Sequence, residues 1–412
     1  MQRRLCLAFA LCLVASSAAP SSQSRAGKAR TLYDLHRPFA LIQKVEGDAN
    51  APPLYRGAVE AMRNQSASAV PDLNAVIRNA PRSHDAVEAH DLLANMYAHS
   101  GRYREALDQV QAALAVQPKA PDAASMLPLL RALGRLPDQT VTARAAATFP
   151  MQIEGGGVLL PLTVNAKGAN FVADTGAGID ALSRSAAARL GLTPLKVVAN
   201  IGGIAGKSAP VQVAVAKTVT VGRVQLANVA FLVLPDSTPP FNGLPVRQQG
   251  IIGLPLLIAL QSIRWRPAAK NFSCGFSWPV PPTAARLAFQ PQGSGILTQA
   301  VVLGKTLTFT LDSGAQATGL TAEFAARFPR LIAAGRKQQH RMTGVDGSRE
   351  FSSVVVPLLR FRLAGLELPL HNTPILTTND NGLAFAGNLG DDLLDQARIV
   401  TIDFGSMVLA LQ

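Results

Sequence analysis

Two aspartates of this chain occupy closely matching local contexts. Asp174 ends one apolar run and is followed by Thr-Gly-Ala, and Asp312 ends another and is followed by Ser-Gly-Ala. They are 138 residues apart, about the length of one small domain. Two carboxyl groups held close together cannot both ionise, so one keeps a proton and acts as an acid while the other acts as a base. The repeated motif therefore predicts an acid–base pair to which two related lobes contribute one carboxylate each.

The residues that follow each aspartate fit such a pair. The hydroxyls of Thr175 and Ser313 can form hydrogen bonds that tie the two loops together, and Gly176 and Gly314 supply freedom from a Cβ where the chain turns. An ionised carboxylate can then take a proton from a bound water while its protonated partner polarises a carbonyl group. The reaction that this predicts is hydrolysis of a peptide bond without a covalent intermediate.

The segments around the aspartates recur in the same order, which indicates an internal duplication. A strand hairpin precedes each aspartate and a helix-like stretch follows it, with Ser183 and Thr321 at the predicted N-caps. An apolar element then ends at Gly253 in one copy and at Gly390 in the other, 137 residues apart. This offset nearly equals that of the aspartates.

On these motifs, residues 157–411 resemble the retropepsin-like (retroviral-type) aspartic peptidases, with two lobes in one chain as in the pepsin-like enzymes. The resemblance implies that Asp174 and Asp312 are the catalytic dyad and that the glycine elements lie behind the active-site loops. Residues 251–253 (Ile-Ile-Gly) fit the family pattern, whereas Asn388 replaces the first apolar residue of the second element. The second lobe is therefore the half in which a loss of activity would be expected first.

The resemblance also implies a β-hairpin flap that closes over the substrate. Each lobe has a glycine-rich candidate about 30 residues after its aspartate. The possible flap glycines are Gly202, Gly203 and Gly206 in the first lobe and Gly344 and Gly347 in the second. Two flaps are the retroviral arrangement, and neither candidate has the flap tyrosine typical of pepsin-like enzymes. Ordinary hairpin turns are an equally good interpretation, because glycine is routine in such turns.

Residues 31–149 have a helical, alanine-rich pattern. Gly101 and Gly134 are each followed by Arg and lie 33 residues apart, a spacing that resembles tetratricopeptide repeats. The alternative is an ordinary domain of helical hairpins. In either case, helix pairs of this kind commonly present a concave surface to a protein partner, which makes such a partner a candidate.

The N-terminus has the pattern of a secretory signal. Arg3 and Arg4 precede an apolar stretch at 5–15, and small residues follow at 16–19. We expect residues 1–19 to be removed and the protein to be exported, periplasmic or secreted. The apolar stretch is too short for a comfortable membrane span, and no later stretch is long enough.

The composition excludes several function classes. The chain has 412 residues, 48% of them apolar and only 16% charged, which suits a large folded core. Its net charge of +13 comes from scattered Lys and Arg residues without interleaved aromatics, so nucleic-acid binding is not expected. The six histidines have no ligand spacing, and Asp391, Asp392 and Asp395 fit a solvated helix start better than a cation site. We expect no metal and no cofactor.

The sequence therefore predicts a multidomain protein, with an all-α region followed by an all-β bilobal acid-protease fold of two duplicated barrels. The expected divisions are a signal peptide at 1–19, a linker at 20–30, a helical domain at 31–149, one lobe at 150–280, a linker at 281–295 and a second lobe at 296–412. The predicted function is that of an exported aspartic endopeptidase acting on a polypeptide. The alternative is a catalytically inactive peptidase-like module that binds a peptide or protein.

Overall fold

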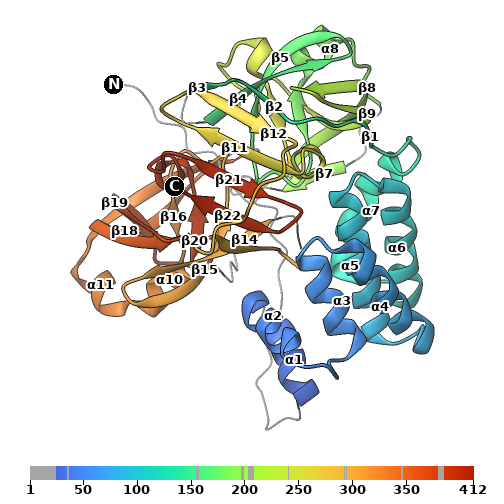
Figure 1. Cartoon of the computed structure of the whole chain (residues 1–412), viewed down its shortest axis with the longest axis horizontal. Helices are drawn as coiled ribbons and strands as arrows, with labels where there is room; N and C mark the ends of the chain where they lie inside the picture. Colours follow the sequence, from blue (N-terminus) through green and yellow to red (C-terminus); the bar gives the residue numbers. More distant parts are fainter. Residues whose placement is uncertain are drawn as a thin grey trace.

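The computed structural model of the protein describes residues 25–34, 37–154, 157–195, 199–202, 208–239, 241–291, 293, 295–344, 347–378 and 385–412. Helices come first along the chain, and two β lobes follow, with the helices lying beside them (Figure 1). This confirms the predicted fold class. The expected signal peptide at 1–19 lies outside the described residues.

The N-terminal region is helical because short amphipathic segments bury one face each against their neighbours. The helices are α1 (Arg25–Asp34), α2 (Pro38–Glu46), α3 (Pro53–Met62), α4 (Ser66–Asn79), α5 (His84–His99), α6 (Tyr103–Val116) and α7 (Pro121–Leu133). From α3 to α7 each helix packs against the next. Ala58, Ala89 and Ala106 are fully buried, and such small side chains let helices approach closely. The assignment to tetratricopeptide repeats stays a prediction.

The helical region begins and ends earlier than the sequence predicts. Helix α1 occupies the second half of the segment 20–30, which was expected to be a linker. At the other end, helices stop at Leu133, whereas the helical pattern was expected to reach residue 149. The strands β1 (Thr140–Ala143) and β2 (Ala147–Pro150) fill the end of that range. β-Branched residues favour strands, but four-residue strands are too short to show a clear period.

The first lobe is a closed barrel of six strands. The ring runs in the order β9-β6-β10-β5-β4-β8, and β8 pairs back to β9. Its elements are β3 (Gln152–Glu154), β4 (Gly157–Val164), β5 (Lys167–Ala173), β6 (Ala181–Ser183), α8 (Arg184–Leu190), β7 (Ala199–Gly202), β8 (Ser208–Val221), β9 (Val224–Leu234), the 3-10 helix η1 (Val246–Gln248), β10 (Gly250–Ile252) and α9 (Leu254–Ala259).

The second lobe repeats this barrel with equivalent strands. The ring runs β18-β19-β16-β20-β15-β14, and β14 pairs back to β18. Its elements are β14 (Ile296–Val302), β15 (Lys305–Leu311), β16 (Gly319–Leu320), α10 (Ala322–Arg327), α11 (Pro329–Ala334), β17 (Arg336–Gly344), β18 (Gly347–Leu363), β19 (Leu366–Leu376), β20 (Gly387–Leu389) and α12 (Asp391–Leu394). The matching order of pairings is the structural counterpart of the duplicated sequence.

A sheet of six strands joins the two lobes. Its order is β13-β22-β21-β11-β12-β2, and its remaining elements are β11 (Ser262–Arg266), β12 (Asn271–Cys274), β13 (Ala285–Phe289), β21 (Val400–Asp403) and β22 (Val408–Leu411). The central pair is β11 with β21, in which Trp265 of the first lobe lies opposite Val400 of the second. The predicted linker at 281–295 therefore contains a strand, because β13 pairs with both β14 and β22.

The helix that follows each aspartate begins differently in the two lobes. In the first, Ser183 Oγ accepts a hydrogen bond from Ala186 N, and Gly191 ends α8 with a φ of 73°, as the sequence predicts. In the second, Thr321 makes no capping bond to α10. Its hydroxyl instead donates to the carbonyl oxygen of Phe385 at 2.5 Å, so the predicted cap is wrong there.

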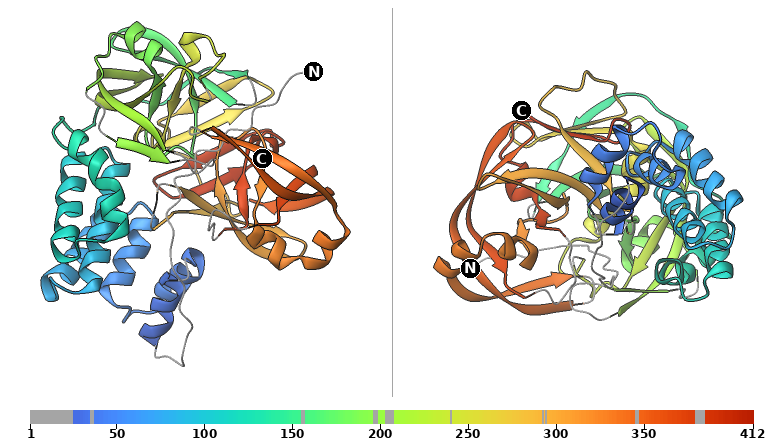
Figure 2. Two further views of the ribbon diagram at one scale, coloured as in Figure 1. Left: turned by 180° about the vertical axis from the view of Figure 1, so that it is seen from behind. Right: turned by 90° about the horizontal axis from the view of Figure 1, so that it is seen from below.

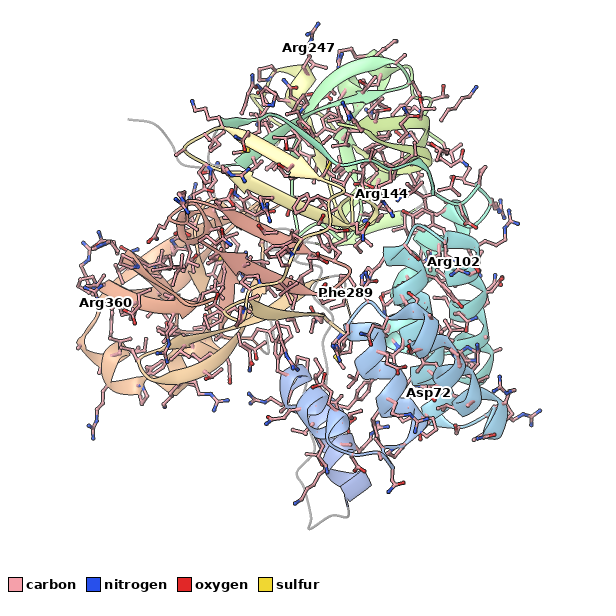
Figure 3. The ribbon with its side chains drawn as sticks, viewed as in Figure 1. Asp72, Arg102, Arg144, Arg247, Phe289 and Arg360 are labelled. Atoms are coloured by element: carbon pink, nitrogen blue, oxygen red, sulfur yellow. The ribbon has the colours of Figure 1, made fainter. Side chains whose placement is uncertain are left out.

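The helices lie beside both lobes in the views from behind and below (Figure 2), and α5 contacts α9 of the first lobe while α3 contacts β13. Gln139 Nε2 donates to the carbonyl oxygen of Pro255 in the first lobe, and Asn64 Nδ2 donates to that of Phe404 near the second. Phe289 of β13 lies where the second lobe meets the helices (Figure 3), and its ring centre is 4.7 Å from that of His99. In the described part of the chain, no helix has both the length and the apolar character needed to cross a membrane.

Candidate active site

Each aspartate of the predicted dyad follows a barrel strand whose last residue, Ala173 or Leu311, is buried. Asp174 comes directly after β5, and its backbone N–H donates to the carbonyl oxygen of Ile252 at 2.9 Å. Asp312 follows β15, and its N–H donates to the carbonyl oxygen of Leu389 at 3.0 Å. These partners lie in β10 and β20, which we call the brace strands. Each brace strand pairs in parallel with the strand that leads to the aspartate.

Glycine is required at the end of each brace strand because the aspartate loop passes directly over it. A Cβ on Gly253 would lie 2.7 Å from the carbonyl oxygen of Ala177. A Cβ on Gly390 would lie 2.6 Å from that of Ala315. Real Cβ atoms do not approach so closely, and overpacking of this kind displaces backbone. The sequence expectation that the glycine elements lie behind the aspartate loops agrees with this placement.

Four hydrogen bonds between the lobes join the two aspartate loops. Thr175 Oγ1 donates to the carbonyl oxygen of Leu311 at 2.9 Å and accepts from Ser313 N at 3.0 Å. Ser313 Oγ donates to the carbonyl oxygen of Ala173 at 2.9 Å and accepts from Thr175 N at 3.1 Å. Both side chains are buried. This cross-lobe lattice holds the two loops in one nearly symmetric arrangement.

The two carboxyl groups meet at the centre of this lattice. Gly176 N donates to Asp174 Oδ1 at 2.8 Å, and Gly314 N donates to Asp312 Oδ1 at 3.0 Å. Each glycine also lies against the carboxyl group of the other lobe. A Cβ on Gly176 would stand 2.5 Å from Asp312 Cγ, and a Cβ on Gly314 would overlap the carboxyl group of Asp174.

Burial and proximity shift the proton affinity of both aspartates. Asp174 is 2% exposed and Asp312 is 3% exposed. Burial raises the pKa of Asp174 well above its usual value, and the charge of Asp312 and a hydrogen bond with it raise this pKa further. Burial also raises the pKa of Asp312, although hydrogen bonds from Asn388 and with Asp174 act in the opposite direction. The pair therefore retains a proton at a pH where isolated aspartates are ionised.

Asn388, the residue that departs from the family pattern, is bonded into this site. Its Nδ2 donates to Asp312 Oδ2 at 2.8 Å, and its Oδ1 accepts from Thr310 Oγ1 at 2.6 Å. The sequence marks Asn388 only as an irregular position, because the pattern gives no indication that its side chain reaches the aspartate. In the first lobe Ile251 occupies the equivalent position of the brace strand and has no polar side-chain atom to offer.

Two further polar residues support the loops and were missed from the sequence. Asp180 Oδ1 accepts from Gly253 N at 2.7 Å, and Thr318 Oγ1 accepts from Gly390 N at 3.0 Å. Each lies six positions after its aspartate in the chain. A comparison of the two copies at this fixed offset could have found them, since both supply an oxygen acceptor.

Asp391 and Asp392 begin α12, and Asp392 is exposed, as expected of a solvated helix start, whereas the burial of Asp391 corrects that expectation. Asp391 is 2% exposed, and neither of its carboxylate oxygens has a hydrogen-bond partner. Burial raises its pKa well above the usual value, and the nearby charges of Asp395, Asp312 and Asp174 add to the rise. Asp392 Oδ1 instead accepts from both the N–H and the hydroxyl of Thr318.

The flap candidates that the structure describes lie in two antiparallel strand pairs, β7 with β8 and β17 with β18. In the first lobe Gly202 of β7 pairs with Ser208 of β8, while Gly203 and Gly206 lie outside the described residues. In the second lobe Gly344 of β17 pairs with Gly347 of β18. Whether either hairpin closes over a substrate stays a prediction.

Comparison with known proteins finds a family match within the first lobe. Residues 160–256 match the family model described as aspartyl protease, which confirms the resemblance predicted from the sequence. A retropepsin-like aspartic protease from Rickettsia conorii aligns over 34% of this chain and 96% of its own, with 18% identity and a TM-score of 0.25. A search of curated protein sequences finds no match.

Two other solved structures each align over 65% of this chain. The protein edgp matches over 65% of this chain and 94% of its own, with 11% identity and a TM-score of 0.39. Conglutin gamma, a basic 7S globulin from lupine seeds, matches over the same shares with 10% identity and a TM-score of 0.38.

The cross-lobe lattice can be tested at Thr175. Thr175→Val removes the hydroxyl and leaves a buried carbonyl and a buried N–H without partners, which should lower the free energy of unfolding by about 2–4 kcal/mol. Thr175→Ser is the matched control, because Ser313 already forms the equivalent bonds in the other lobe. Thr175→Ser should lower the free energy of unfolding clearly less than Thr175→Val does. Urea unfolding measures both, and equal losses would contradict a hydrogen-bonded role for the hydroxyl.

Asp391 should make stability depend on pH. Its pKa is raised in the folded state, so the folded protein holds this proton more tightly than the unfolded chain does, and the contribution of Asp391 to stability falls as pH rises above about 4. Asp391→Leu, which copies Leu254 of the first lobe, should therefore raise the free energy of unfolding at pH 7 by about 1–3 kcal/mol. The gain should shrink towards pH 4 in urea unfolding. A gain that does not change with pH would show that the carboxylate is not the cause.

Proposed function

We propose that this protein is an aspartic endopeptidase that hydrolyses polypeptides with a water molecule activated between Asp174 and Asp312. The observation that carries the proposal is the direct apposition of the two buried carboxyl groups, each of which lies against the glycine of the opposite loop. The aspartyl protease match over residues 160–256 supports the same class of activity.

The proposed reaction needs one proton on the pair. The ionised carboxylate accepts a proton from the attacking water, and the protonated carboxyl donates to the carbonyl oxygen of the scissile bond as it gains charge. Neither step forms a bond between protein and substrate. The raised pKa of Asp174 favours retention of the required proton from acidic towards neutral pH.

The surrounding structure supports separate acid and base roles for the two carboxyl groups. Backbone N–H groups at Gly176 and Gly314 hold one oxygen of each carboxyl in place, so that little reorganisation is needed during the reaction. The cross-lobe lattice restricts movement of the two loops relative to each other. The β7–β8 and β17–β18 hairpins are the candidates for covering an extended polypeptide.

Removal of either carboxylate tests the activity. Asp174→Asn and Asp312→Asn should each lower hydrolysis of an unfolded polypeptide by at least about 10³-fold between pH 4 and pH 7, because each removes one half of the acid–base pair. Asp108→Asn, on the exposed face of α6, is the control and should leave the rate unchanged.

Three outcomes of this experiment are informative. Loss of cleavage in both variants, with wild-type folding retained, supports the proposal. Cleavage that persists in both overturns it. Binding of the polypeptide by the wild-type protein without any turnover would instead favour the peptide-binding module.

We also propose that the enzyme acts outside the cytoplasm, periplasmic or secreted, on the basis of the charged and apolar pattern of residues 1–19. The intact mass of protein recovered from the exported fraction should correspond to a chain that begins near residue 20. Recovery of only the full-length chain, from the cytoplasm, would contradict export and leave the proposed chemistry unaffected.

A further inference from the structure

The two lobes differ at one pair of positions beside the aspartates. On each brace strand, one residue lies opposite the second-last residue of the strand that leads to the aspartate. In the first lobe this pair is Ile251 with Val172, and both side chains are aliphatic. In the second lobe the same register position holds Asn388 with Thr310. A wholly apolar pair in one copy is therefore a wholly polar pair in the other.

The polar pair fixes the direction in which the Asn388 amide points. Thr310 Oγ1 lies 2.6 Å from Asn388 Oδ1 and 3.2 Å from the carbonyl oxygen of Gly387, so the closer amide oxygen is the main acceptor of its single hydrogen. The amide oxygen is thereby occupied by a donor, so the amide nitrogen faces the other way, towards Asp312. Asn388 Nδ2 donates to Asp312 Oδ2 at 2.8 Å.

This contact gives the two carboxyl groups different hydrogen-bond environments. Asp312 accepts from Gly314 N at Oδ1 and from Asn388 at Oδ2, so both of its oxygens face donors. Asp174 accepts from Gly176 N at Oδ1, but Ile251 offers no donor to its second oxygen. A hydrogen bond donated to a carboxylate stabilises the ionised form over the protonated one.

We propose that Asn388 is a positioning residue that keeps the single proton of the pair on Asp174 and leaves Asp312 ionised. In the proposed function, Asp312 is then the base that takes the proton from water, and Asp174 is the acid that protonates the carbonyl oxygen. This catalytic consequence rests on the proposed function, whereas the placement of the proton does not and can be measured without any turnover.

The other groups around the pair agree with this assignment. Burial raises the pKa of both aspartates, and the bond from Asn388 opposes that rise for Asp312 alone. Asp391, at the start of α12, interacts electrostatically with both carboxyls. The charges of Asp392 and Asp395 act on Asp391 in turn. These acids are the same in every variant below, so they do not account for a difference between variants.

The test isolates each carboxyl and asks whether Asn388 acts on it. The aspartate side-chain carboxyls are labelled with carbon-13 in Asp174→Asn, which leaves Asp312 to titrate, and in Asp312→Asn, which leaves Asp174. Each protein is then compared with and without Asn388→Ile, which copies Ile251 of the first lobe. NMR titration of the labelled carboxyl gives its pKa directly.

The proposal predicts an effect on one aspartate only. Asn388→Ile should raise the pKa of Asp312 by about 1–2 units, the amount expected when a hydrogen bond to a charged group is lost. It should move the pKa of Asp174 by less than about 0.5 unit. Thr310→Val, which leaves the amide in place but removes the donor that orients it, should raise the pKa of Asp312 by a smaller amount.

A reciprocal variant provides the matched control. Ile251→Asn together with Val172→Thr installs the polar pair in the first lobe and should lower the pKa of Asp174. Circular dichroism identifies any variant that fails to fold, and Thr310→Val then replaces Asn388→Ile in the comparison. Equal shifts of both aspartates, or no shift of Asp312, would overturn the proposal.

The pH dependence of kcat/KM links the result to catalysis. With Asn388→Ile, the acid limb of the profile should move to higher pH by about 1–2 units, because the base ionises less readily. If the wild-type protein does not cleave polypeptides, the proposed function fails but the NMR titration still decides the role of Asn388. If the wild-type protein cleaves polypeptides but Asn388→Ile does not change the pKa of Asp312, the inference about Asn388 fails and the proposed function stands.

Discussion

The structure depends on holding two carboxyl groups in contact in a place from which water is largely excluded. Burial opposes ionisation of both aspartates, and the charge of Asp312 further opposes that of Asp174, so this arrangement costs free energy that the surrounding fold has to offset. The cross-lobe lattice fixes the positions of the two loops relative to each other, because each hydroxyl forms a hydrogen bond with the backbone next to the opposite aspartate. The closed barrels and the brace strands limit movement of the loops, because each loop is packed against a brace strand and cannot shift away from the opposite carboxyl group.

The two copies are equivalent in backbone but not in side chains. Their strands close in the same ring order, and their brace strands take the same register beside the aspartates. The differences lie at particular positions, where Asn388 stands for Ile251, Thr318 for Asp180, and Asp391 for Leu254. Symmetry of the backbone brings the carboxyls together, and asymmetry of the side chains can then give them different roles.

Much of this arrangement could be predicted because duplication supplies an internal comparison. The paired aspartates, their neighbouring hydroxyls and glycines, and the cap at Ser183 all follow from short local patterns with a physical reason. The strand β13 could not be predicted within a Pro- and Ala-rich segment, since its pairing partners are set by tertiary contacts. The predicted N-cap at Thr321 was wrong for a related reason, because its hydroxyl donates to the carbonyl oxygen of Phe385, which lies far away in the sequence. The burial of Asp391 likewise cannot be read from a sequence in which two adjacent acids usually indicate solvent.

The sheet that joins the lobes has a consequence for how the protein is made on the ribosome. The edge of β11 is completed by β21, so the strand at residues 262–266 has no partner on that side until residues 400–403 have emerged. An unpaired edge is a site for misassociation, which makes the interval between these two segments the vulnerable period of synthesis. The same delay separates the translation of Asp174 from that of Asp312. A nascent chain that carries only the first barrel has one of the two paired aspartates and none of the cross-lobe hydrogen bonds, so the pair cannot assemble until the second barrel has been made.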